Sequence, residues 1–245
     1  MKASTMTNTC RKNYRQSVEL SVKNRFMEGM LTEKRGFMMK KKILITGFEP
    51  FGKDTVNASW EAVSRLEDRI GDLEVTKLLI PTVFGEAAEK VLEAARELQP
   101  DVILCVGQAG NRTMVTPEMV AINLRDASIE DNAGKKPQEE PVVPGGPTAY
   151  FSSICVRKIV ETVRSGGIAC GISYSAGAYV CNDLFYSLRH HYEGSGTGVG
   201  FIHVPCLAKQ GEGKGPGLPE QHDGARPGMP LEDIVQALRL AVGAL

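Results

Sequence analysis

The stretch GEAAEKVLEAARELQPDVILCVG, residues 85–107, determines the fold class. In its first part, apolar residues recur every three or four positions opposite a charged face, which is typical of an amphipathic helix closed by Pro100. Its second part, DVILCVG at 101–107, is continuously apolar, as in a strand buried on both faces. A helix that leads directly into such a strand indicates an α/β protein with a parallel sheet.

The same alternation of strand and helix patterns extends along the chain from residue 40. We therefore predict an α/β fold: a single domain with a mostly parallel twisted sheet and helices on both faces, in a three-layer α/β/α arrangement. Ligands bind such sheets beyond the C-terminal ends of the strands. The expected strands are 41–47, 73–81, 101–107, 168–173 and 198–205, with a shorter alternating run at 119–123, and the expected helices are 57–70, 85–100, 148–164, 178–192 and 230–245.

Composition argues against several function classes. The 245 residues carry a formal net charge of zero, so there is no electrostatic case for a nucleic-acid or anionic-membrane partner. No run approaches the roughly 20 apolar residues of a membrane span. The six cysteines include no CxxC pair and no Cys/His cluster with zinc-ligand spacing, which predicts no metal site. We read them as reduced thiols in a cytoplasmic protein.

Residues 1–39 differ from the rest because they are polar and basic. We expect them to be a disordered arm, or upstream sequence translated ahead of a true start at Met38 or Met39. A mitochondrial presequence is disfavoured by the acidic residues in the segment. Residues 40–245 are expected to form the functional domain.

The stretch SAGAYVCND, residues 175–183, presents a cysteine near the start of an expected helix. There, unpaired backbone N–H groups and the positive end of the helix dipole would stabilise a thiolate and lower the pKa of Cys181. The same N–H groups could receive an oxyanion. The alternative is that Cys181 simply fills core, since free cysteine is among the most buried residue types.

Two further residues have both a structural and a catalytic interpretation. His203 lies in the apolar run GFIHVP, where a histidine is usually a satisfied core residue, but it also falls near the expected end of its strand. With a cysteine nearby, it could act as the general acid and base of thiol acyl transfer. Glu118 lies where a loop meets a strand and is either solvated or the carboxylate that orients this histidine. Phe48 and Phe51 in TGFEPFG are either loop anchors or walls of an apolar pocket.

Together these stretches resemble the pyroglutamyl-peptidase I family of cysteine peptidases, also called pyrrolidone-carboxylate peptidases. The resemblance covers residues 40–205 and implies that 40–245 is a catalytic domain in which Cys181 is the nucleophile, His203 the general acid and base, and Glu118 its carboxylate partner. The matching stretches are ILITGFEPFG, VNASWEAV, IPTVFGEA, VGQAGNR, PEMVAINL, DNAGKKP, PVVPGGPTAYF, SAGAYVCN and GFIHVP.

The resemblance also implies the substrate. Family members remove an N-terminal pyroglutamate (5-oxoproline) from peptides through a thioacyl-enzyme intermediate, without a cofactor, and are often homo-oligomers such as dimers or tetramers. A lactam without a charged amine needs a small apolar slot and amide-matching hydrogen bonds. The family pattern assigns substrate binding to Phe48, Phe51 and Gln108, with Thr82, Ile129, Tyr179 and Val180 near the pocket.

One stretch departs from the family pattern. Where members usually read DARIPDN, this chain reads DASIEDN, so Ser128 replaces an arginine linked to the oxyanion region. Arg125 could reach in instead, or strand alternation could point it away. Loss of one oxyanion contact can cost about 10²–10³ in rate. The alternative function is therefore a pyroglutamyl-peptide-binding protein with weak or lost turnover.

Overall fold

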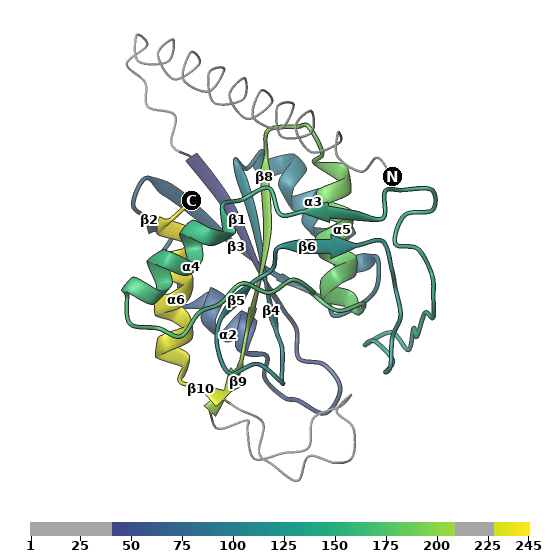
Figure 1. The fold of residues 1–245 in the computed structure, drawn as a ribbon, viewed down its shortest axis with the longest axis horizontal. Coiled ribbons are helices and arrows are strands. Elements are labelled where there is room, and N and C mark those ends of the chain that lie inside the picture. The colour runs from purple at the N-terminus through teal and green to yellow at the C-terminus, as the bar shows by residue number, and fades with distance from the viewer. Residues whose placement is uncertain (1–40, 209–227) are drawn as a thin grey trace, which may run out of the picture. The chain divides into compact units, whose positions relative to one another are not determined.

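The centre of the fold is a sheet of six strands in the order β2-β3-β1-β4-β8-β5 (Figure 1). The computed structural model describes residues 41–208 and 228–245. Strands β3, β1, β4 and β8 are parallel, while β2 and β5 run antiparallel at the two edges, which confirms the predicted mostly parallel sheet. The bounds are β1 Lys41–Phe48, β2 Arg69–Ile70, β3 Leu73–Ile80, β4 Val102–Gln108, β5 Thr116–Pro117 and β8 Gly198–Val204.

Helices cover both faces of this sheet because its inner strands are apolar on both sides. Helices α2 (Ala58–Ser64), α4 (Val156–Ser165) and α6 (Leu231–Gly243) pack on one face (Figure 1). Helices α3 (Glu86–Leu98) and α5 (Val180–His191) pack on the other. Within β4, Leu104 and Val106 contribute to the first core and Ile103 and Cys105 to the second, as strand alternation requires.

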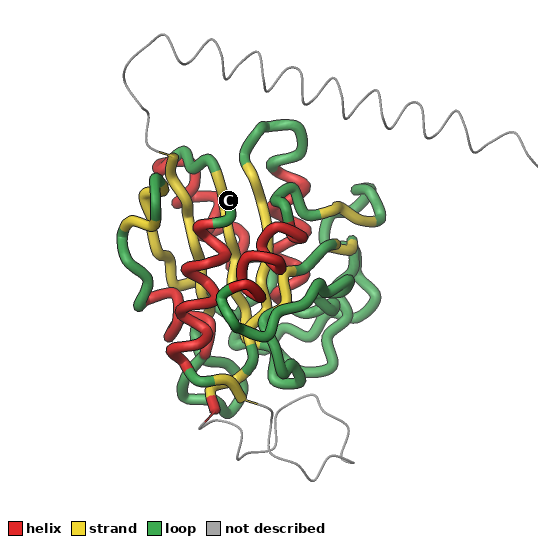
Figure 2. The backbone as a smooth tube through the Cα atoms, turned by 60° about the vertical axis from the view of Figure 1, so that its left-hand side comes forward, coloured by secondary structure: helices red, strands yellow, loops and turns green. Residues whose placement is uncertain are grey.

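Between β4 and α5 the described chain is mostly loop, apart from α4 and short strands (green in Figure 2). Strands β6 (Val120–Ile122) and β7 (Ala149–Phe151) form an antiparallel pair beside α5, and β9 (Cys206–Leu207) pairs with β10 (Gly228–Met229).

Two predicted helices are shorter than expected. Residues 149–151 form β7, and helix α4 starts only at Val156, because the aromatic stretch around Tyr150 pairs with β6. Helix α2 ends at Ser64, because residues 69 and 70 form a hairpin with β3 across Gly71, whose φ of 58° suits a turn.

The expected strand at 168–173 is not continuous. The segment does run parallel to residues 115–119: Gly171 N donates to Val115 O at 3.0 Å, and Ser173 N donates to Pro117 O at 2.9 Å. The bond between these two would need an N–H on Pro117, which proline lacks. The pairing is therefore reduced to isolated bridges at the edge of the sheet.

The described residues, 41–208 and 228–245, belong to one compact unit. The predicted N-terminal arm, residues 1–39, lies outside the described residues. In the described part of the chain, no helix combines the length and the apolar character needed to cross a membrane.

Candidate active site

The predicted catalytic residues gather near the C-terminal ends of the parallel strands. His203 is the next-to-last residue of β8, and Glu118 follows directly after β5, which pairs with β8. Cys181 is the second residue of α5. Cys181 follows Glu118 by 63 positions in the sequence, and His203 follows Cys181 by 22. The fold nevertheless places all three residues at one end of the sheet.

Glu118 and His203 form a buried pair. The Glu118 side chain is fully buried, and its Oε1 lies 2.7 Å from His203 Nδ1. Because a carboxylate can only accept, the imidazole donates its Nδ1–H, which leaves the lone pair of Nε2 available to take a proton. The Phe201 ring packs against the imidazole with its centroid 4.8 Å away. The ring of His203 is therefore fixed in both orientation and tautomer.

The sulfur of Cys181 lies over the strand pair that carries the imidazole. It is 2.9 Å from the point that a Cβ on Gly107 would occupy. Gly107 of β4 is the register partner of His203 in β8, so its missing Cβ and the His203 Cβ point to the same face. Neighbouring strands are only about 4.8 Å apart. The thiol and the imidazole therefore occupy adjacent positions on one face of the sheet.

The start of α5 offers unused hydrogen-bond donors. Tyr179 precedes the helix in an extended conformation, and the first helical bond runs from Asp183 N to Tyr179 O at 3.1 Å. The N–H groups of Val180, Cys181 and Asn182 therefore have no intrahelical acceptor. Together with the positive end of the helix dipole, they suit an oxyanion that forms next to the thiol.

The environment of the thiol opposes ionisation. Part of the Cys181 residue is open to solvent, but the dense protein around its sulfur raises its pKa above the usual range, and the charge of Glu118 and the neighbouring Cys105 add to that rise. This direction is opposite to the one expected from the helix start alone. The thiol is therefore neutral at rest and needs a base to remove its proton.

Arg112 is a functional candidate that sequence reasoning missed. Its Nη2 lies 3.3 Å from Glu118 Oε1 and donates to Ser173 Oγ at 3.0 Å and to Ser175 O at 3.2 Å. One guanidinium thus joins the carboxylate to the loop that leads into α5. The motif GQAGNR places this arginine six residues before Glu118, but nothing in the motif indicates a contact with residues 173 and 175.

Several predicted pocket residues do come together around Tyr179. Its ring lies 6.3 Å from that of Phe51, and its hydroxyl donates to the carbonyl of Glu130 at 2.9 Å, next to the half-buried Ile129. Thr82 is buried, and its hydroxyl donates to the backbone carbonyl of the residue after β1, at 3.1 Å. These contacts join the loops at 49–51, 81–84 and 129–130 at the end of the sheet.

Phe48 and Val180 belong to the core instead of lining an open slot. Phe48 is 2% exposed, and its ring lies 6.4 Å from that of Phe201. Val180 is fully buried at the start of α5. Both residues pack in the same apolar cluster as Phe201 and Tyr179, so they stabilise the core next to the site.

The side chain of Gln108 is directed to α2. Its Oε1 accepts from Ala58 N, the first residue of that helix, at 2.7 Å, and its Nε2 donates to Asp54 Oδ2 at 3.2 Å. Alternation along β4 explains this direction, because Cys105 and Gly107 face α5 and the next residue faces the opposite side. The amide thus caps a helix in this structure.

Arg125 and Ser128 occupy different surroundings. Arg125 Nε donates to Asp183 Oδ1 at 2.6 Å, and the other oxygen of this fully buried carboxylate accepts from Gly85 N at 2.8 Å. Arg125 is therefore held by α5 through Asp183. Ser128 is exposed. Neither side chain supplies a contact to the thiol among the interactions of the described residues.

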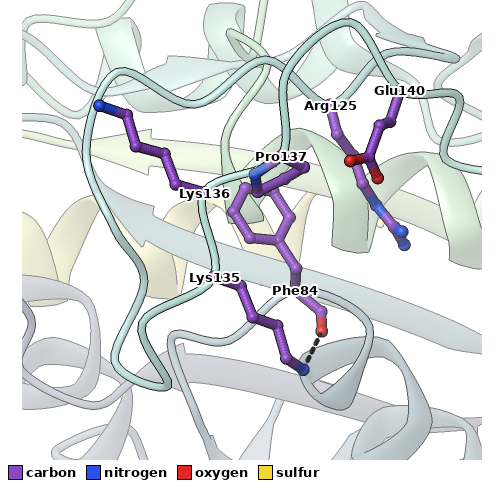
Figure 3. A pocket seen from close by; sticks show the side chains of 6 residues that line it. All are labelled: Phe84, Arg125, Lys135, Lys136, Pro137 and Glu140. Atoms are coloured by element: carbon purple, nitrogen blue, oxygen red, sulfur yellow. Dashed lines mark hydrogen bonds between the residues drawn. The ribbon is translucent and has the colours of Figure 1, made fainter.

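A cavity of about 380 Å³ is lined by Arg125 but by none of the residues predicted for catalysis or substrate binding (Figure 3). Two of its cations are already paired: Lys135 lies 3.1 Å from Glu86 and donates to Phe84 O at 3.3 Å, and Arg125 is held by Asp183. We therefore do not assign it to catalysis. The cavity is lined by Phe84, Arg125, Lys135, Lys136, Pro137 and Glu140.

In the described ranges, no group of three or more His, Cys, Asp or Glu side chains is arranged to hold a metal.

Comparison with known proteins gives consistent results. The family model described as pyroglutamyl peptidase matches residues 41–245. The pyrrolidone-carboxylate peptidase of Bacillus subtilis is 43% identical over 206 residues, which cover 83% of this chain and 91% of that protein. One from Vibrio vulnificus is 42% identical over 201 residues, covering 82% and 90%. The crystal structure of Bacillus amyloliquefaciens pyroglutamyl peptidase I is similar with a TM-score of 0.76, at 42% identity, covering 83% of this chain and 96% of that one. A mutant pyrrolidone carboxyl peptidase from Pyrococcus furiosus also reaches 0.76, at 38% identity, covering 83% and 97%.

Proposed function

The chain belongs to the pyroglutamyl peptidase family, and from that premise we propose that it removes an N-terminal pyroglutamyl residue from peptides with Cys181 as the nucleophile. The observation that carries this proposal is the 2.7 Å contact between buried Glu118 and His203 Nδ1, on the sheet face where the Cys181 sulfur lies. A neutral thiol, a base with a free lone pair and a carboxylate behind it form a set suited to acyl transfer.

In the first step, His203 Nε2 takes the thiol proton while the sulfur attacks the pyroglutamyl carbonyl carbon. The C–S bond forms, and the carbonyl π electrons move to oxygen. The N–H groups at the start of α5, those of Cys181 and Asn182 in particular, donate to this oxyanion. Because burial raises the pKa of the thiol, the attack depends on His203 as the base that removes this proton.

In the second step, the C–N bond breaks and His203 Nε2–H gives its proton to the departing amine. The pyroglutamyl group is left as a thioester on Cys181. Water then attacks this thioester with His203 as the base, the C–S bond breaks, and pyroglutamate and the thiol are released. Glu118 stabilises the imidazolium in both steps. The proposed steps require no metal or organic cofactor.

For substrate binding, we propose that the lactam ring lies against the aromatic group formed by Phe51 and Tyr179, with Ile129 and Thr82 close by. An uncharged five-membered ring loses little solvation on entering such surroundings, whereas a free N-terminal ammonium would lose its charge–water contacts there. This difference favours a blocked N-terminus over an ordinary one. We also propose a cytoplasmic location, in keeping with free thiols, and a homo-oligomeric state, as the family resemblance implies.

Turnover of pyroglutamyl-7-amino-4-methylcoumarin tests the proposal. We expect the full chain to release the fluorophore and Cys181→Ser to abolish the release, while Cys155→Ser, which changes an exposed cysteine, leaves it intact. Full activity of Cys181→Ser would overturn the assigned nucleophile. Tight binding of the substrate by the unmodified protein without turnover would instead favour a binding protein.

A further inference from the structure

We propose that Gly107 is a positioning residue for the nucleophile: its bare Cα provides the space in which the Cys181 sulfur sits beside His203. A side chain at position 107 would move the sulfur away from the imidazole. The inference rests on the proposed function, because it assigns importance to the distance between these two groups.

The space at Gly107 is filled from two sides. An added Cβ would lie 2.9 Å from Cys181 Sγ, 2.9 Å from Phe201 Cζ and 3.1 Å from Phe201 Cε1. The first two distances are shorter than a carbon atom tolerates, so both the sulfur and the ring would have to shift. The Phe201 ring also contacts His203, so a side chain here disturbs the thiol and the imidazole together.

The need for glycine at this position is not conformational. Gly107 lies within β4 and its φ is not positive, so any L-residue could adopt its backbone conformation. A glycine inside a strand weakens the strand and commonly marks a place where another group approaches closely. Here the approaching group is the sulfur of Cys181.

Helix α5 cannot retreat to make room. Asn182, the residue after the cysteine, accepts from Ile122 N at 3.0 Å and donates to Ile122 O and Leu124 O at 2.9 and 3.0 Å. Leu184 and Phe185 are fully buried under the same helix. The thiol would therefore have to rotate about its own side-chain bond, which moves it off the position next to His203.

The first test is kinetic. We expect Gly107→Ala to lower kcat about 100-fold, the loss typical of a misplacement of about 1 Å, with little change in KM. The matched control is Gly200→Ala in the neighbouring strand, where a Cβ would meet the flexible Ile154 side chain on the opposite face of the sheet. This control should lower Tm but keep kcat. If Gly107→Ala keeps kcat to the same degree as the control, the proposal is overturned.

The second test needs no activity. Cys181→Ala removes the sulfur, so Gly107→Ala should lower Tm less in that background than in the unmodified chain. The overlap with the Phe201 ring is present in both backgrounds, so the difference between the two Tm losses reports on the sulfur alone. Equal Tm losses would overturn the role of Gly107 and leave the proposed function untouched. An active Cys181→Ser protein would overturn the assigned nucleophile without affecting this cycle.

Discussion

Replacing Glu118 by glutamine separates the charge of this side chain from its hydrogen bonding. Oε1 accepts from His203 Nδ1 at 2.7 Å and faces Arg112 Nη2 at 3.3 Å, while Oε2 is buried with no hydrogen-bond partner among the described residues. In Glu118→Gln, the amide oxygen can take the place of Oε1 and the NH₂ group that of Oε2. The Nδ1–H tautomer of the imidazole is then kept, and only the negative charge is lost.

The size of the effect follows from this geometry. A hydrogen bond to a charged group contributes about 1.5–3 kcal/mol and one between neutral groups about 0.5–1.5 kcal/mol. The difference of about 1–1.5 kcal/mol corresponds to a loss of roughly 5- to 13-fold in kcat/KM. Glu118→Ala removes the acceptor altogether and releases the tautomer of His203, so its loss should reach about 10³–10⁴-fold.

The assay is kcat/KM for pyroglutamyl-7-amino-4-methylcoumarin with the unmodified chain and the two Glu118 variants at one pH. A Tm measurement on each protein shows that the comparison is made on folded enzyme. If the glutamine and alanine variants lost the same factor in kcat/KM, the glutamine oxygen would not be replacing Oε1. That result would refute the assignment of the His203 and Arg112 hydrogen bonds to this one oxygen. Unchanged activity in the glutamine variant would refute the role of the charge.

Three other predictions concern the thiol, the loop that departs from the family pattern and the anchor of α5. The labelling rate of Cys181 by iodoacetamide, read by mass spectrometry, should keep rising above pH about 8.5, the ordinary thiol pKa, because its own pKa is raised; a plateau below pH 7 would instead indicate a preformed thiolate. Ser128→Arg should raise kcat about 10-fold, less than the 10²–10³ of a preorganised donor because the site is exposed, and an unchanged kcat would leave the backbone N–H groups as the sufficient donors. Asp183→Ala should lower the free energy of unfolding by about 3 kcal/mol in a denaturant titration, the lower end for a broken buried pair, since the Arg125 side chain is 23% exposed; a loss below 1 kcal/mol would contradict the assigned role of the pair.

Much of the fold could be predicted because its signals are local. The continuous apolar runs at β1, β4 and β8 and the spacing of apolar residues in α3 are set by neighbouring residues alone. The incorrect segments depend on partners far away in the sequence. The local pattern of residues 149–151 predicts a helix, but these residues pair with β6 in the structure. The interrupted pairing beside Pro117 follows from the N–H that proline lacks, in a pairing with residues more than 50 positions later.

The site was predictable in part for the same reason. Topology places the ends of parallel strands together, so Cys181 and His203 could be expected at one edge of the sheet. The directions of Gln108 and Arg125 were harder, because the first depends on strand alternation next to Gly107 and the second on a carboxylate contributed by α5. The role of Arg112 could not be predicted, since it depends on a loop about 60 residues later.

The interrupted pairing at the edge of the sheet has a consequence for how the protein loses activity on heating. Glu118 is held there by a two-residue strand and by bridges broken at a proline, whereas His203 is carried by a long inner strand. Weakly paired edges open before a core does. Thermal inactivation should therefore begin when the Glu118 carboxylate separates from the His203 imidazole, at a temperature where the helices and the inner strands are still folded.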